Sequence, residues 1–68
     1  MTDTEKFINS AQLFSENLDV YPKEFGRRIT VDCIMTDDND ERLAILNMGV
    51  DNGLKIDDYI ALKHIWLE

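Results

Sequence analysis

The sequence predicts an α+β fold, in which an N-terminal amphipathic helix packs on a small, mainly antiparallel sheet. Three patterns lead to this prediction: apolar residues at helical spacing in residues 2–18, alternating apolar and polar residues in 28–36, and a nearly continuous apolar stretch in 59–67. The chain has 68 residues, so we expect a single domain over residues 1–68.

The first expected element is a helix over residues 2–18. Thr2 and Glu5 have the spacing of a capping box, in which each side chain accepts a hydrogen bond from a backbone amide of the first turn. Tyr21 and Pro22 end the pattern, because the residue before a proline disfavours helical conformation. One apolar stripe runs along the helix: Phe7, Ala11, Phe14 and Leu18.

A strand is expected over residues 28–36, after a break in the pattern at Gly26. Ile34 interrupts the alternation of this segment, which indicates that the second face of the strand is partly covered. The apolar residues that alternate with polar ones, as on a sheet with one buried face, are Ile29, Val31, Cys33 and Met35.

The segment 41–48 fits either a second short helix or a third strand. Its residues are good helix formers, and Leu43, Leu46 and Val50 fall at positions i, i+3 and i+7. The same segment could instead return as the second strand of a hairpin. Helix is slightly favoured, and Gly49 would end it.

Residues 59–67 are predicted to form a strand. In a helix, Lys63 would fall within the apolar arc, whereas nearly continuous hydrophobicity with aromatic residues and isoleucine is typical of a central strand. A sheet of two strands is too small to be stable alone. Edge strands of two copies could therefore pair and form a homodimer.

Acidic residues outnumber basic residues by 14 to 7, which gives the chain a net charge of −7. Such a charge repels nucleic acid phosphates and anionic membranes, and it attracts basic protein surfaces. We therefore expect a basic protein partner, with no membrane contact and no direct nucleic acid binding. Six acidic residues are predicted to bind this partner: Asp37, Asp38, Asp40, Glu41, Asp57 and Asp58.

No motif in the sequence predicts catalysis, a metal site or a cofactor. Cys33 and His64 are the only cysteine and histidine, and a nucleophilic pair would need them within hydrogen-bond reach. A small core residue and a partly exposed histidine are the simpler interpretation. The acidic run that starts at Asp37 lacks the glycine and the final glutamate of an EF-hand loop, because Arg42 and Met48 stand at those positions.

The lone cysteine fits a reducing compartment, and residues 1–6 lack the basic and apolar regions of a signal peptide. We therefore expect a cytoplasmic protein. The function expected first is a non-enzymatic, acidic protein-binding module. It would be a small regulator or inhibitor, of phage or mobile-element type, that occupies a basic, nucleic-acid-handling surface of its partner. Acidic side chains would steer the encounter, and exposed aromatic side chains would anchor the complex.

The alternative comes from a family resemblance. Residues 28–67 resemble ribbon-helix-helix repressors in their order of a strand, a helix, a glycine-containing turn and a final segment, with an extra helix at the N-terminus. Arg28 and Thr30 would point the same way on the strand, as groove-reading residues do in that family. The resemblance implies a dimeric DNA-binding transcriptional regulator, although the net charge of −7 disfavours DNA binding.

Overall fold

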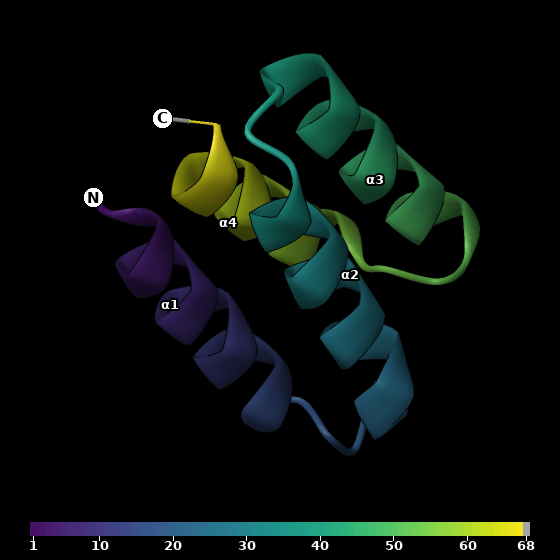
Figure 1. The fold of residues 1–68 in the computed structure, drawn as a ribbon. Helices are drawn as coiled ribbons and strands as arrows, with labels where there is room; N and C mark the ends of the chain where they lie inside the picture. The colour runs from purple at the N-terminus through teal and green to yellow at the C-terminus, as the bar shows by residue number, and fades with distance from the viewer. Residues whose placement is uncertain (68) are drawn as a thin grey trace.

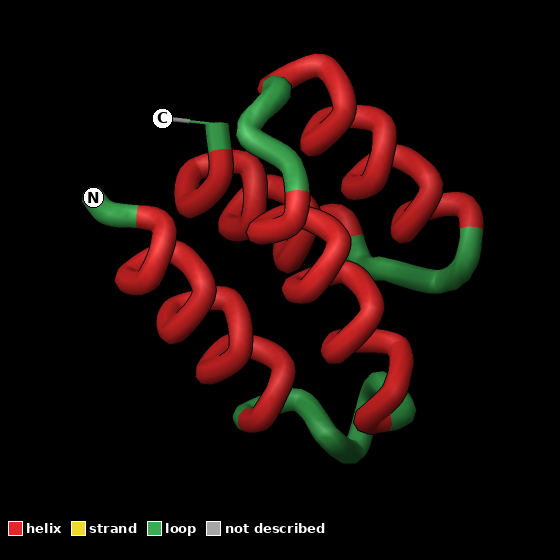
Figure 2. Tube along the Cα trace, viewed as in Figure 1, coloured by secondary structure: helices red, strands yellow, loops and turns green. Residues whose placement is uncertain are grey.

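The computed structural model describes residues 1–67, and no strand occurs within this range (Figures 1 and 2). The predicted α+β fold is therefore wrong, because both segments expected as strands are helices. The ribbon-helix-helix alternative is wrong for the same reason. The described residues form four helices: α1 (Asp3–Ser15), α2 (Lys23–Met35), α3 (Asn39–Asp51) and α4 (Ile56–Trp66).

The helices form an antiparallel bundle, in which each helix packs against the next one along the chain and α4 closes the ring against α1. Contacts at the two ends of the bundle show the helix directions. Arg42, in the first turn of α3, reaches Cys33 near the end of α2 and Trp66 at the end of α4. At the other end, Tyr21 before α2 bonds to Asp58 in the first turn of α4.

Helix α1 begins as the sequence predicts. The Glu5 carboxylate accepts a hydrogen bond from the Thr2 amide (3.0 Å), and the Thr2 hydroxyl accepts one from the Glu5 amide (3.1 Å). The amide and the hydroxyl of Thr2 lower the pKa of the Glu5 carboxyl. The helix ends at Ser15 rather than at Leu18, and residues 16–20 form a turn.

Helix α2 replaces the strand predicted over residues 28–36. Val31 and Met35, which were predicted to share a buried face with Ile29, are exposed. Isoleucine and valine lower helix propensity only slightly, so packing against α1 and α3 decides the structure here. The buried residues of α2 recur every three or four positions, which is the period of a helix: Gly26, Ile29, Thr30 and Cys33.

Helix α3 confirms the helical interpretation of residues 41–48. Asp38 caps its start by accepting a hydrogen bond from the Asp40 amide (2.8 Å). The helix continues through Gly49, where it was predicted to end. Gly49 is buried, and a Cβ added there would lie 3.1 Å from Ile29 Cδ1 of α2. The helix is followed by a turn at Gly53, whose φ of 113° lies in the left-handed region that favours glycine.

Helix α4 replaces the strand predicted over residues 59–67. Leu62 and Trp66 lie one turn apart, and both are fully buried. Lys63, whose charge argued against a helix, is exposed, with its ammonium group 5.5 Å from the centre of the Tyr59 ring. The charge therefore lies at the edge of the apolar arc and not within it.

The core holds α1 and α2 especially close together. Phe14 lies against α2 at Gly26, where an added Cβ would come within 2.5 Å of the phenyl ring. The hydroxyls of Ser10 and Thr30 share a buried hydrogen bond of 2.9 Å. Because residues 1–67 contain no sheet edge, the predicted pairing of edge strands between two copies is wrong.

Candidate protein-binding surfaces

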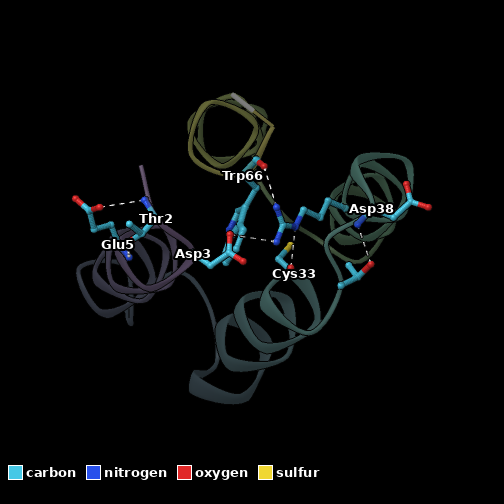
Figure 3. Close-up of polar contacts among 8 residues, drawn as sticks. Thr2, Asp3, Glu5, Cys33, Asp38 and Trp66 are labelled. Atoms are coloured by element: carbon cyan, nitrogen blue, oxygen red, sulfur yellow. Dashed lines mark hydrogen bonds and ion pairs between the residues drawn. The ribbon is translucent and has the colours of Figure 1, made fainter.

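One end of the bundle is organised around Arg42, a buried arginine (Figure 3). Its Nε donates to the Cys33 carbonyl (2.9 Å), and its Nη1 lies 3.5 Å from the Trp66 carbonyl. These carbonyls belong to the last turns of α2 and α4, which carry partial negative charge. The guanidinium also lies over the Trp66 ring, 4.9 Å from its centre, and Nη2 is 3.7 Å from an Asp3 oxygen. Arg42 thereby connects α3 to α1, α2 and α4.

Carboxylates gather at this same end, which we call the acidic end. Helices α1 and α3 both start here, and acidic residues suit the positive start of a helix. From the sequence, Glu5 was expected only as part of a capping box and Asp3 was assigned no role, so their place beside the predicted acidic residues was missed. The acidic end consists of Asp3, Glu5, Asp37, Asp38, Asp40 and Glu41.

The other two predicted partner-binding residues, Asp57 and Asp58, lie at the opposite end of the bundle. They stand in the first turn of α4 beside Tyr21, whose hydroxyl donates to Asp58 and accepts from the Lys55 amide (2.9 Å). Burial and the bond to Asp58 raise the pKa of Tyr21. The six predicted residues are thus divided between two ends and do not form one face.

Some acidic side chains of the acidic end already have partners within the fold. Asp38 caps α3, and the Glu41 carboxylate accepts a hydrogen bond from the Thr36 hydroxyl (2.6 Å). Asp37 and Asp40 are exposed, and within residues 1–67 their carboxylates form no hydrogen bond or ion pair. These two carboxylates are therefore the ones best placed to meet a partner.

An exposed apolar side chain occurs at the acidic end, two residues before Asp37. Met35, in the last turn of α2, directly precedes the loop that contains Asp37, and 79% of its surface is exposed. Methionine is flexible and polarisable, so it adapts well to partner surfaces. The expected aromatic anchor is not formed, because every aromatic side chain within residues 1–67 is buried or half-buried, and Trp66 is wholly buried.

A second surface runs along the outer side of α2. Two grooves flank this helix, one of about 280 Å³ toward α1 and one of about 850 Å³ toward α3, and Arg27 and Val31 line both of them. Lys23, Arg27 and Arg28, the basic cluster of the sequence, are all exposed on α2. The basic cluster of this acidic chain therefore lies along two adjoining grooves.

Arg28 and Thr30, which the family resemblance placed together on a DNA-reading face, point in different directions. Arg28 is exposed and lines the groove toward α3, whereas Thr30 is buried against Ser10 of α1. The groove-reading arrangement of ribbon-helix-helix proteins is therefore not formed.

The thiol of Cys33 is fully buried, and this burial raises its pKa to about 11. At neutral pH the thiol is protonated and out of reach of a substrate, while His64 is exposed on α4. The geometry thus favours the interpretation of Cys33 as a core residue. Within residues 1–67, no group of three or more His, Cys, Asp or Glu side chains is placed to hold a metal ion.

None of the helices described for residues 1–67 is long and apolar enough to cross a bilayer. Comparison with protein-family models, with curated proteins and with solved structures finds no match to this chain.

Proposed function

We propose that this chain is a non-enzymatic protein-binding module that presents its acidic end to a basic surface of a partner protein. It acts as a small regulator or inhibitor, of phage or mobile-element type, and occupies a surface with which the partner handles nucleic acid. The class of regulator is an analogy from size and charge. The lone cysteine supports a cytoplasmic location.

The observation that carries the proposal is the exposure of Met35 in the last turn of α2, at the same end of the bundle as the exposed carboxylates of Asp37 and Asp40. Protein interfaces combine an apolar centre, which loses its water on binding, with a polar rim that remains hydrated. Met35 can supply the apolar contact, and the two aspartates can supply the rim. Asp37 and Asp40 were predicted from the sequence as partner-binding residues, whereas Met35 was expected on the buried face of a strand.

The charge distribution supports a basic partner. Six of the 14 acidic residues lie at the acidic end, so the field there attracts positive charge more strongly than the net charge alone would. Complementary charges raise the association rate of two proteins more than they lower the dissociation rate. The same field repels phosphates, so direct nucleic acid binding is not part of the proposal.

Two pairs of substitutions separate the acidic end from the net charge. Asp37→Lys with Asp40→Lys alters the acidic end, and Asp51→Lys with Asp57→Lys changes the net charge equally at the opposite end. All four aspartates are exposed, and none has a hydrogen bond or ion pair from its carboxylate within residues 1–67. Thermal melts check that both double variants remain folded.

The immobilised parent chain captures partners from a lysate of its source cells, and the association rate of the captured protein is measured at low and moderate salt. We expect a basic partner whose association slows as salt rises, and slows roughly tenfold more with the Asp37/Asp40 pair than with the control pair. Met35→Ala should hasten dissociation, whereas Met48→Ala, also at an exposed methionine, should not. Equal effects of the two charge pairs, or a partner insensitive to salt, would refute the proposal.

A further inference from the structure

The groove between α1 and α2 forms an apolar site on a surface that the proposed function does not use. Its volume is about 280 Å³, and its walls come from both helices, which lie side by side in Figure 1. This is room for large side chains of a partner, but not for a whole helix. The apolar lining includes Phe7, Ala11, Phe14, Leu18, Gly26 and Val31.

The groove remains accessible because of how α1 and α2 pack. Gly26 has no side chain, so Phe14 sinks against the backbone of α2 and leaves a depression above it. Leu18 is 57% exposed and Val31 is 39% exposed at its borders. These side chains would bury further apolar surface if a partner covered them, which is favourable by about 25 cal/mol per Å².

The edge of the groove carries positive charge. Lys23 and Arg27 are both exposed, line the groove and lie one helical turn apart on α2. Arg28 is exposed next to them, at the groove toward α3. The two charged side chains that line the groove toward α1 are therefore both basic, opposite in sign to the net charge of −7.

We propose that this groove docks a short amphipathic helix of a partner protein, with apolar side chains in the groove and carboxylates against Lys23 and Arg27. An amphipathic helix places apolar residues three and four positions apart on one face and can place acidic residues along the border of that face. Carboxylates match the cations at the groove edge, whereas basic peptides would meet them with like charge.

Other anionic occupants fit less well. The α2 surface also carries Glu24 and Asp32, which line the adjoining groove toward α3 and would repel an extended phosphate chain or an anionic lipid surface. A second copy of the chain would bring another net charge of −7. At physiological salt the Debye length is about 8 Å. Salt therefore screens the longer-range repulsion between the acidic chain and an acidic peptide more than it screens direct contacts of Lys23 or Arg27 with a carboxylate.

The test uses a displayed library of random short peptides, selected against the purified full chain at about 0.15 M salt. We expect the enriched peptides to be acidic, with apolar residues at helical spacing, and to shift the amide NMR signals of Leu18, Gly26 and Val31. Arg27→Glu should weaken binding of an enriched peptide roughly tenfold. Lys63→Glu makes the same charge change on α4 and should alter binding less than about twofold.

Leu18→Ser tests the apolar contact separately, because Leu18 lies outside the helices and its loss should leave the fold intact. Leu18→Ser should also weaken binding of the selected peptide. Three results would overturn the proposal: enrichment of basic peptides or of none, NMR shifts outside the groove, and equal effects of Arg27→Glu and Lys63→Glu. Concentration-dependent shifts of the groove signals without peptide would assign the groove to a second copy instead.

Discussion

Arg42 is the residue whose role is least visible in the sequence. It is one of seven basic residues in an acidic chain, yet it is almost completely buried. Burial of a charge is costly unless the charge is hydrogen-bonded and paired. Arg42 meets much of this requirement with the Cys33 and Trp66 carbonyls, so it stabilises the end of α2 and the end of α4 together. Its buried Nη2 makes no hydrogen bond and has only the Asp3 carboxylate at 3.7 Å.

Removal of the Arg42 charge should therefore destabilise the fold. Arg42→Met keeps most of the length of the side chain but leaves the Cys33 carbonyl without its donor. Hydrogen bonds to charged groups contribute about 1.5–3 kcal/mol each, so we expect the free energy of unfolding to fall by about 2–3 kcal/mol. Urea denaturation followed by circular dichroism measures this change.

Two control variants restrict the interpretation of Arg42→Met. Arg27→Met changes the same side chain at an exposed position of α2 and should stay within about 0.5 kcal/mol of the parent. Asp3→Asn should cost less than about 1 kcal/mol, because Asp3 is largely exposed and its ion pair is weak. If Arg42→Met is as stable as the parent, the buried guanidinium does not hold the helix ends together.

At the scale of helices, Gly26 shows why α1 and α2 pack so closely. An alanine is the better helix former by about 1 kcal/mol. At this position, however, its Cβ would lie 2.5 Å from Phe14 Cγ, which is closer than atoms can approach without movement. Glycine lowers the intrinsic stability of α2 at this position, but it allows the buried Phe14 ring to contact the backbone of α2.

Gly26→Ala should therefore lower the free energy of unfolding by about 1–3 kcal/mol despite its higher helix propensity. Phe14→Leu should reduce this cost only in part, because leucine keeps a Cβ and a Cγ, the atoms that in Phe14 lie 2.6 and 2.5 Å from the added carbon, but lacks the rigid ring and can move away more readily. Leucine is preferred here to alanine, since Phe→Ala in a core costs about 3–5 kcal/mol and would unfold so small a domain. Denaturation of the two single variants and the double variant gives the coupling energy.

Gly49→Ala is the matched control for Gly26→Ala. Gly49 is also in a helix interior, but its added Cβ would lie 3.1 Å from Ile29 Cδ1 and 3.3 Å from Leu54 Cδ2, the ends of two side chains. Movements of a few tenths of an ångström in these side chains relieve both contacts, so the change should be nearly neutral. Equal costs at the two glycines would mean that the close contact with Phe14 is not the cause of the destabilisation by Gly26→Ala.

The sequence predicted α1 well and α2 badly for the same physical reason. The capping box of Thr2 and Glu5 is local, so it can be recognised before any tertiary contact is known. In α2, alternating β-branched residues also occur at positions compatible with a helix, and only the contacts with α1 and α3 show which periodicity is used. Ile29 and Cys33, four residues apart, were the signal for a helix.

Helix α4 was mispredicted because a charge was assumed to break the apolar arc. Leu62 and Trp66, four residues apart, form the buried stripe, and Lys63 extends past Tyr59 to solvent. Long basic side chains cover apolar surface with their methylene groups and keep the charge hydrated. A lysine next to an apolar stripe is therefore weak evidence against a helix.

Across the whole molecule, the acidic residues could be predicted as candidates, but their arrangement could not. Which ends of the helices meet depends on the bundle topology, whereas the sequence-based prediction assigned 37–41 and 57–58 together to one partner-binding set. The bundle separates these segments and brings 37–41 to the end where α1 starts. The exposed position of Met35 follows from the same change from strand to helix.

The net charge of −7 also makes a prediction about stability. Folding brings the carboxylates closer together, so their repulsion opposes the compact state, whereas those in the first turns of α1, α3 and α4 gain from the helix starts. With 14 acidic residues against 7 basic ones, we expect repulsion to outweigh these gains. Added salt screens it, because the Debye length falls from about 30 Å at 0.01 M to about 8 Å at 0.15 M.

The melting temperature should therefore rise by several degrees between about 0.01 M and 0.15 M sodium chloride, as a change of about 1 kcal/mol shifts it by roughly 4–8 °C in a domain of this size. Calorimetry measures the shift. A double variant with Asp37→Asn and Asp57→Asn, both at exposed carboxylates, should melt higher at low salt and respond less to added salt, because two like charges are gone. A melting temperature that falls with salt would contradict this expectation. It would mean that the attraction between carboxylates and helix starts exceeds the repulsion between carboxylates, so that the acidic residues of this chain stabilise the fold on balance.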